Sequence, residues 1–201
     1  MKPLRVLVVH GYWWGPDSKW AVLFNISVCE FVAGVHTNYD LILLLSGWGG
    51  NGRKDTIAEL QRDTLTICFD VPREKIKLAS YGCTAERLRI QADFGFVGLP
   101  PLDTWQEVDE VKKMLLTLEL LDVPIDVVTM HWHATRTCFI YRLKGLKVNR
   151  LFRVDGVLII TRFIREVAAL LIALVDQDGQ GAILRYERLK RLKEMRQSRK
   201  D

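Results

Sequence analysis

Four short apolar runs, each followed by a stretch with helical spacing, constrain the fold more than any other feature of this chain. They cover residues 4–9, 39–45, 76–79 and 125–130, and a fifth run lies within residues 146–154. Short runs rich in leucine and β-branched residues suit strands that are buried on both faces. Strands that alternate with helices indicate a parallel sheet with right-handed crossovers. The sequence therefore predicts an α/β fold with a doubly wound, mostly parallel five-stranded sheet, flanked by helices and extended by C-terminal helices.

The helical stretches have recognisable ends. The predicted helices cover residues 20–32, 55–69, 104–121 and 134–143. Gly34 and Gly145 are expected to cap the first and the last of them. Val123-Pro124 is expected to end the third, because a proline and the residue before it resist helical geometry. Residues 82–103 contain several glycines and Pro100-Pro101, so we expect a long functional loop around a short helix there.

The 201 residues fit one domain with a small extension. We expect residues 1–155 to form the α/β core and residues 156–201 to form helices that pack on it, the last of them basic. The apolar stretch 157–175 resembles a membrane span in its hydropathy. Arg162, Arg165 and Glu166 lie near its middle, where each would be costly in a bilayer. A buried or interface helix is the better interpretation.

The net charge of +5 belongs to one end of the chain. Residues 185–201 contain eight basic and three acidic side chains, so the remaining body has 21 of each sign. A basic terminal helix is usually a solvated face. Nucleic acid is therefore an unlikely partner, while peripheral membrane contact through the basic helix stays open.

The cysteines predict a reduced, cytoplasmic protein. Cys29, Cys68, Cys83 and Cys138 are widely spaced and form no C-x-x-C pair. Cys29 and Cys68 lie in apolar helical patterns and are expected to be small core residues. The first residues, Met1-Lys2-Pro3, show no signal peptide.

Polar or glycine-rich segments follow three of the predicted strands, and they locate a ligand site. The segments are His10-Gly11, residues 46–52 and residues 131–136. In parallel α/β sheets, ligands bind beyond the carboxyl ends of the strands, where the strand order reverses. We therefore expect these three segments to meet around a polar small molecule.

The loop Ser46-Gly47-Trp48-Gly49-Gly50-Asn51-Gly52 has four glycines in seven residues. Glycines let the backbone approach a ligand, and free N–H groups at a helix start favour an anion. The loop has neither the lysine of a P-loop nor the dinucleotide fingerprint. We expect Gly47, Gly49 and Gly50 to cradle the ligand. Tryptophans near two strand ends could stack on a flat ring or simply anchor the loops; they are Trp13, Trp14 and Trp48.

His131 and His133 form an H-x-H pair at a strand end. No following aspartate or nearby glutamate completes a metal site, so we expect no metal. The histidines could instead only hydrogen-bond a loop. Arg136 lies one turn after His133, which suits recognition of a phosphate or carboxylate, and His133 can exchange a proton near neutral pH. Thr104 and Glu107 have the spacing of a capping box, which explains them structurally at least as well as a ligand role.

Four short motifs, in order, resemble those of the YdcF-like, SanA and ElyC group, a domain family of unknown function. Residues 129–136 resemble its T-S-x-x-H-M-x-R-A segment, and Ser46-Gly47-Trp48-Gly49 its S-G-G loop. Val71-Pro72 resembles its G-V-P turn, and residues 103–107 its N-T-x-E-N segment. The resemblance covers roughly residues 4–155 and implies a Rossmann-like fold. It also implies a site, built from Gly11, Ser46, Gly47, Gly49, Thr104, Glu107, His133 and Arg136.

Some members of that group are reported to bind S-adenosylmethionine, and others take part in bacterial envelope biogenesis. The resemblance thus implies S-adenosylmethionine as a candidate cofactor. Our leading hypothesis is an enzyme, a transferase or hydrolase, that acts on a nucleotide-like or phosphorylated ligand. His133 and Glu107 would be catalytic, and Gly11, Ser46, Gly47, Gly49, Gly50, Thr104 and Arg136 would bind the ligand. The alternatives are a non-catalytic ligand-sensing module, an envelope-related accessory protein, and a scaffold that docks through its basic helix.

Overall fold

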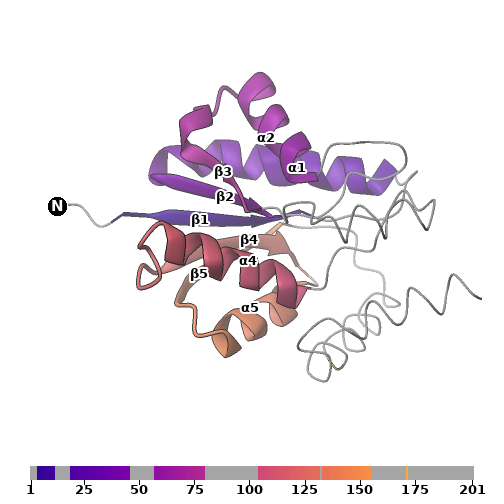
Figure 1. The fold of residues 1–201 in the computed structure, drawn as a ribbon. Helices are drawn as coiled ribbons and strands as arrows, with labels where there is room; N and C mark the ends of the chain where they lie inside the picture. The colour runs from indigo at the N-terminus through magenta and orange to yellow at the C-terminus, as the bar shows by residue number, and fades with distance from the viewer. Residues whose placement is uncertain are drawn as a thin grey trace, which may run out of the picture.

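The computed structural model describes residues 4–11, 19–45, 57–79, 104–131, 133–154 and position 171. Its centre is a five-stranded sheet with helices on both faces (Figure 1). The predicted loop at 82–103 and the predicted C-terminal helices lie outside the described residues, apart from Leu171. Of the helices that the structure describes, none is long and apolar enough to cross a membrane.

The sheet is parallel throughout, with the strand order β3-β2-β1-β4-β5. Its strands are β1 (Val6–His10), β2 (Leu41–Leu45), β3 (Ile76–Leu78), β4 (Ile125–Met130) and β5 (Val148–Val154). Every residue of β1, β2 and β4 is buried, which explains why these strands are continuous apolar runs in the sequence. The prediction of a doubly wound parallel sheet is confirmed. The strand order reverses between β1 and β4, so this is where a ligand site is expected.

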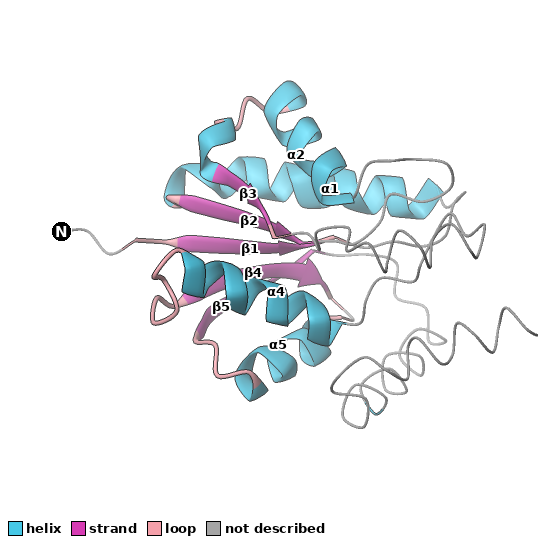
Figure 2. Ribbon diagram, in the orientation of Figure 1, coloured by secondary structure: helices cyan, strands magenta, loops and turns pink. Residues whose placement is uncertain are grey.

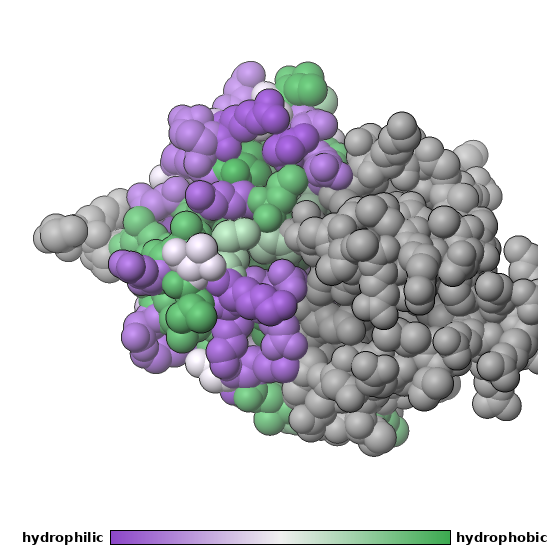
Figure 3. Space-filling model, viewed as in Figure 1, coloured by the Kyte–Doolittle hydropathy of each residue, from purple (hydrophilic) through white to green (hydrophobic). Residues whose placement is uncertain are grey.

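Of the described helices, two pack on each face of the sheet, and Figure 2 shows the two pairs on opposite sides of it. They are α1 (Lys19–Val35), α2 (Ile57–Cys68), α4 (Thr104–Thr117) and α5 (Ala134–Leu143). Alternate residues of the central strands pack on opposite faces: Val6 and Val8 lie in the cluster under α4 and α5, and Leu7 and Val9 in the cluster under α1 and α2. On the face shown in Figure 3, hydrophilic and apolar side chains are intermixed over the described helices.

Gly34 does not cap the first helix, so that prediction was wrong. The helix continues through Gly34 to Val35 and passes into a 3₁₀ turn at His36–Asn38. Nδ1 of His36 lies 2.7 Å from the carbonyl oxygen of Ala33, so the imidazole satisfies one of the carbonyl groups that a helix end leaves without an intrahelical partner. A polar side chain after the helix thus replaces the expected glycine.

Cys29 is buried in the core as predicted, but the prediction for Cys68 was wrong. Cys68 is the last residue of α2 and is exposed. A residue at the end of an amphipathic helix can leave the buried face without disturbing the packing of the earlier turns. Of Cys29 and Cys68, only Cys29 fills space in the core.

The ends of α4 and α5 share one geometry, in which one residue after the helix has a left-handed backbone. That residue differs between the two helices. After α5, Gly145 has a φ of +75°. The N–H of Gly145 donates to the carbonyl of Arg142, and the N–H of Leu146 donates to the carbonyl of Tyr141. This is a Schellman motif, and the predicted cap at Gly145 is confirmed. After α4 the same pair of bonds forms around Glu119, whose φ is +59°. The helix therefore ends at Thr117, and the prediction that Val123-Pro124 ends it was wrong.

Replacing Glu119 by glycine and Gly145 by alanine should change the free energy of unfolding in opposite directions. Residues with a side chain adopt a left-handed backbone at a cost in free energy, and Glu119→Gly removes that cost. We expect Glu119→Gly to stabilise the protein by about 0.5–1 kcal/mol. Gly145→Ala should destabilise the protein by about 1 kcal/mol, because alanine adopts this left-handed backbone at a cost. An added Cβ would meet no atom within 4 Å, so no steric clash contributes to that cost. Urea unfolding of both variants measures the effect. Shifts of the same sign in the two variants would contradict this interpretation of the helix ends.

A buried carboxylate lies at the amino end of the sheet, opposite the expected ligand site. Asp126 accepts a hydrogen bond of 2.7 Å from the hydroxyl of Tyr39 and one of 2.8 Å from the amide of Asn149. Asp126 and Tyr39 are both buried, and the guanidinium of Arg5 lies 5.1 Å from the centre of the Tyr39 ring. These contacts tie β4 and β5 to the segment that precedes β2.

Candidate functional site

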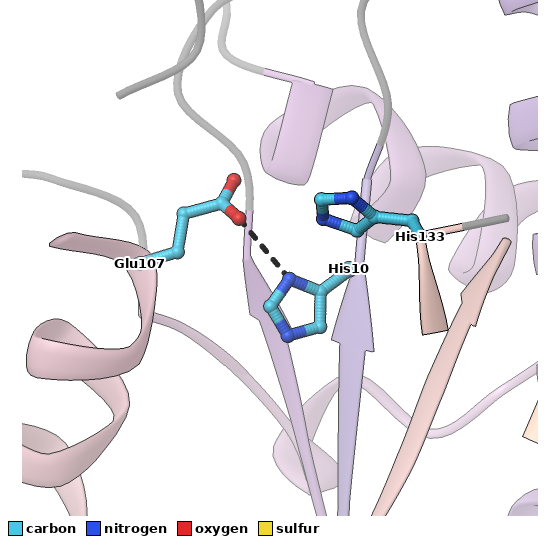
Figure 4. A group of neighbouring side chains, drawn as sticks. All are labelled: His10, Glu107 and His133. Carbon is cyan, nitrogen blue, oxygen red and sulfur yellow. Dashed lines mark hydrogen bonds and ion pairs between the residues drawn. The ribbon is translucent and has the colours of Figure 1, made fainter. Parts of the chain in front are cut away.

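Four of the residues predicted for the site come together at the carboxyl edge of the sheet. Thr104 and Glu107 lie in the first turn of α4, and His133 immediately precedes α5, which carries Arg136. His10, the last residue of β1, lies among them (Figure 4). Because β1 and β4 are neighbours in the sheet, the segments that follow them open onto the same place.

One chain of contacts runs through His10. Nδ1 of His10 lies 3.1 Å from Oε2 of Glu107, and Nε2 lies 3.0 Å from the hydroxyl of Tyr141. All three side chains are buried. Burial, and to a lesser extent the charge of Glu107, raises the pKa of Tyr141 well above its usual value. The tyrosine therefore keeps its hydroxyl proton and remains able to donate a hydrogen bond.

A second chain runs through His133. Nδ1 of His133 lies 2.7 Å from a terminal guanidinium nitrogen of Arg136, and Nε2 lies 3.0 Å from the hydroxyl of Thr104. His133 and Thr104 are buried and Arg136 is half-buried. The rings of His10 and His133 meet edge to face, with centroids 6.1 Å apart. The two chains therefore form one cluster of polar groups.

The contacts of Thr104 and Glu107 reach beyond their own helix. A capping box would use these side chains to satisfy backbone N–H groups of α4. In the structure Thr104 contacts His133, which is 29 residues away, and Glu107 contacts His10, which is 97 residues away. The two side chains therefore belong to the cluster, whatever they contribute to the start of the helix.

The cluster contains the donor types of a metal site, in an arrangement that suits hydrogen bonding better. One ligand atom from each of His10, Glu107 and His133 lies within 4.8 Å of the other two. A histidine that binds a metal normally donates its second ring N–H to a carboxylate or carbonyl. The second nitrogen of His133 faces the guanidinium of Arg136, which can only donate and is itself a cation. A divalent ion on His133 would have to displace that contact.

The two predicted histidines of the H-x-H pair separate. His131 is exposed, whereas His133 is buried in the cluster. The histidine that completes the cluster is His10. No individual role was predicted for it, although its segment was expected at the site. Tyr141 was also missed. It lies in the middle of a helical pattern, and no local signal distinguishes it from a core aromatic residue.

Gly11 lies beside the cluster at the end of β1. Its N–H donates a hydrogen bond of 2.7 Å to the carbonyl of Leu45, so it joins the ends of β1 and β2. Its contact with a ligand stays a prediction. The remaining predicted binding residues lie outside the described residues, as do the three tryptophans; they are Ser46, Gly47, Gly49 and Gly50.

Comparisons of the chain with protein-family models, with curated proteins and with solved structures found no match. The resemblance to the YdcF-like, SanA and ElyC group therefore stays a prediction from the motifs.

Proposed function

We propose that the chain is an enzyme that binds a small nucleotide-like or phosphorylated ligand at the carboxyl ends of β1 and β4. One observation carries the proposal: two histidines, a glutamate and a threonine are buried together, beside an arginine, where the strand order reverses. Burying polar groups costs free energy unless they are paired. A buried, paired cluster of titratable groups at this point of an α/β sheet is typical of a binding or catalytic site.

The proposed roles follow from charge and proton capacity. Arg136 supplies a positive charge for the anionic group of the ligand. Glu107 and His133 are the groups to which we assign proton transfer, because carboxylates and imidazoles are the side chains that most often act as general acids and bases. Transfer and hydrolysis are the reaction classes that we propose, with S-adenosylmethionine as the candidate cofactor in the first case. A cytoplasmic location fits the reduced state expected of the cysteines.

Ligand binding can be tested by thermal unfolding of the purified protein with a panel of compounds. The panel contains S-adenosylmethionine, nucleotides, sugar nucleotides and sugar phosphates. A ligand at 100 times its Kd stabilises by about 2.7 kcal/mol, which raises the melting midpoint of a chain of this size by about 5–10 °C. Arg136→Ala should lower the affinity for the compound that raises the midpoint by about tenfold or more, and the shift in midpoint should fall accordingly. Arg142→Ala, an exposed arginine on the same helix, is the matched control.

Absence of any shift, or equal shifts in Arg136→Ala and the native protein, would refute the site assignment. Once a ligand is known, prolonged incubation separates an enzyme from a sensing module. We expect product formation that falls by about 100-fold or more in His133→Gln or Glu107→Gln. A ligand that binds tightly and is recovered unchanged would support the non-catalytic alternative instead.

A further inference from the structure

We propose that His10 holds its proton on Nδ1 and His133 on Nε2, and that this arrangement makes Thr104 a hydrogen-bond donor and Glu107 an acceptor toward the ligand. The inference rests on the proposed function and adds the class of ligand. The site would select a molecule that presents an oxyanion close to a hydroxyl or amino group. A hydroxylated phosphate monoester, such as a sugar phosphate, has this chemistry.

The proton on His133 is placed by Arg136. A guanidinium has only donors, so Nδ1 of His133, 2.7 Å from it, must accept. A neutral imidazole that accepts at Nδ1 carries its proton on Nε2, and this N–H then donates to the hydroxyl of Thr104 at 3.0 Å. A hydroxyl that accepts from a histidine still has its own proton to donate. The oxygen of Thr104 therefore becomes a donor for the ligand.

The proton on His10 is placed by Glu107 and Tyr141. An ionised carboxylate can only accept, so Nδ1 of His10 donates to Glu107. Tyr141 keeps its proton and donates to Nε2, the nitrogen of His10 that has a lone pair in this tautomer. Each of the hydrogen-bond donors that link Tyr141, His10 and Glu107 then meets an acceptor. Figure 4 shows the carboxylate of Glu107 and the ring of His133 facing each other above the ring of His10.

The two sides of the site differ in what they bind. Thr104 and Arg136 form a donor side that suits phosphate or carboxylate oxygens. Glu107 forms an acceptor side that repels a bare oxyanion and suits a hydroxyl or amino group. The ligand atoms of His10, Glu107 and His133 lie within 4.8 Å of one another, so the two groups of the ligand must lie close together. Inorganic sulfate, which carries no hydroxyl at neutral pH, satisfies only the donor side.

The proton positions can be measured in the full-length protein by nuclear magnetic resonance with ¹⁵N-labelled histidine. The chain has four histidines, and His36→Gln and His131→Gln identify the two signals from outside the cluster. At neutral pH we expect the Nδ1–H pattern for His10 and the Nε2–H pattern for His133. Arg136→Ala should move His133 toward Nδ1–H, and Arg142→Ala should not. The native protein alone decides the question if a variant fails to fold.

The same proton position in both rings, or His133 with its proton on Nδ1, would overturn the inference. So would a simultaneous change of both histidine signals on adding one equivalent of Zn²⁺, because a metal would then occupy the cluster. Either result leaves the proposed ligand site in place. It removes only the assignment of donor and acceptor sides.

Calorimetry with ribose 5-phosphate, ribose and inorganic sulfate tests the ligand class. We expect ribose 5-phosphate to bind at least about tenfold more tightly than the other two, because it alone engages both sides. Thr104→Val should weaken the binding of ribose 5-phosphate, and Thr104→Ser should restore it. Glu107→Gln should strengthen the binding of sulfate by removing a like charge.

Equal affinities for ribose 5-phosphate and inorganic sulfate would overturn the ligand class. So would the absence of ribose 5-phosphate binding in a protein that a nucleotide does stabilise. If neither S-adenosylmethionine nor any phosphorylated compound binds while the two tautomers are opposite, the proposed function fails and the proton placement stands. The two proposals can therefore fail separately.

Discussion

Asp126→Ala should be among the most destabilising single substitutions in the described part of the chain, at about 3 kcal/mol. The change removes two hydrogen bonds to a buried carboxylate and leaves the hydroxyl of Tyr39 buried without its acceptor. Hydrogen bonds to a charged group contribute about 1.5–3 kcal/mol each, and a stranded buried donor costs a further 1–3 kcal/mol, while relaxation and water reduce the sum. The expected fall in melting midpoint is on the order of 10 °C.

The control for this substitution is Asp122→Ala. Asp122 also forms an ion pair near β5, because its Oδ1 lies 3.1 Å from Nζ of Lys147, the residue before that strand. Its side chain, however, is almost fully exposed. Exposed pairs of this kind contribute little, so the midpoint should stay within experimental scatter. Asp126→Asn keeps the shape and one acceptor, and it should fall between the two. A loss no greater for Asp126→Ala than for Asp122→Ala would show that the buried carboxylate does not hold the strands together.

Alkaline pH should destabilise the protein steeply, starting below the usual range of tyrosine ionisation. Burial, with smaller contributions from Cys68 and Glu30, raises the pKa of Cys29 to about 12. Burial also raises the pKa values of Tyr39 and Tyr141 above their usual range. The folded pKa exceeds the unfolded pKa in each case, so the unfolded chain loses these protons first. The stabilising contribution is complete below the unfolded pKa and is lost as the pH rises toward the folded one.

The loss should begin near pH 8.5 for the thiol and near pH 10 for the two phenols. Each group then lowers the free energy of unfolding by about 1.4 kcal/mol per pH unit. Urea unfolding between pH 7 and 11, with a reductant present, measures the slope. Cys29→Ala should flatten the curve from about pH 9, and Tyr141→Phe should flatten it only above about pH 10.

Parallel curves for the native protein and Cys29→Ala would mean that the thiol ionises equally in the folded and unfolded chains. The same comparison for Tyr141→Phe isolates the phenol beneath the site. Because this variant also loses the hydrogen bond to His10, its slope is informative and its absolute stability is not.

The sheet was predictable because burial on both faces leaves a direct trace in the sequence. Residues 125–130 read as a strand and form β4 within the same limits, since every one of them is buried. Helix ends were less predictable. The expected glycine cap at Gly145 formed, but Glu119 adopts the same left-handed geometry without being a glycine, and Gly34 lies inside a helix. Tertiary contacts decide such ends, and a local pattern does not contain them.

The site was predictable in its location and only partly in its members. The rule for ligands in parallel sheets predicts that the segments of His10, His133 and Arg136 lie at one edge of the sheet. The rule does not say which side chains touch. His10 contacts Glu107 and Tyr141, which are 97 and 131 residues away, and those pairings depend on the packing of α4 and α5 against the sheet. No spacing in the sequence records them.

Tyr141 belongs to two systems at once. Its ring is part of the apolar cluster under α4 and α5, and its hydroxyl holds His10. A protein designer who repacks that cluster, for example to gain thermal tolerance, would therefore also retune the chemistry above it. Conversely, a change of substrate preference at His10 would have to be accommodated by the layer below. Among the described residues, no side chain of the cluster on the other face, where Val28 and Val32 pack, contacts His10 in this way, so that cluster is the safer place to vary.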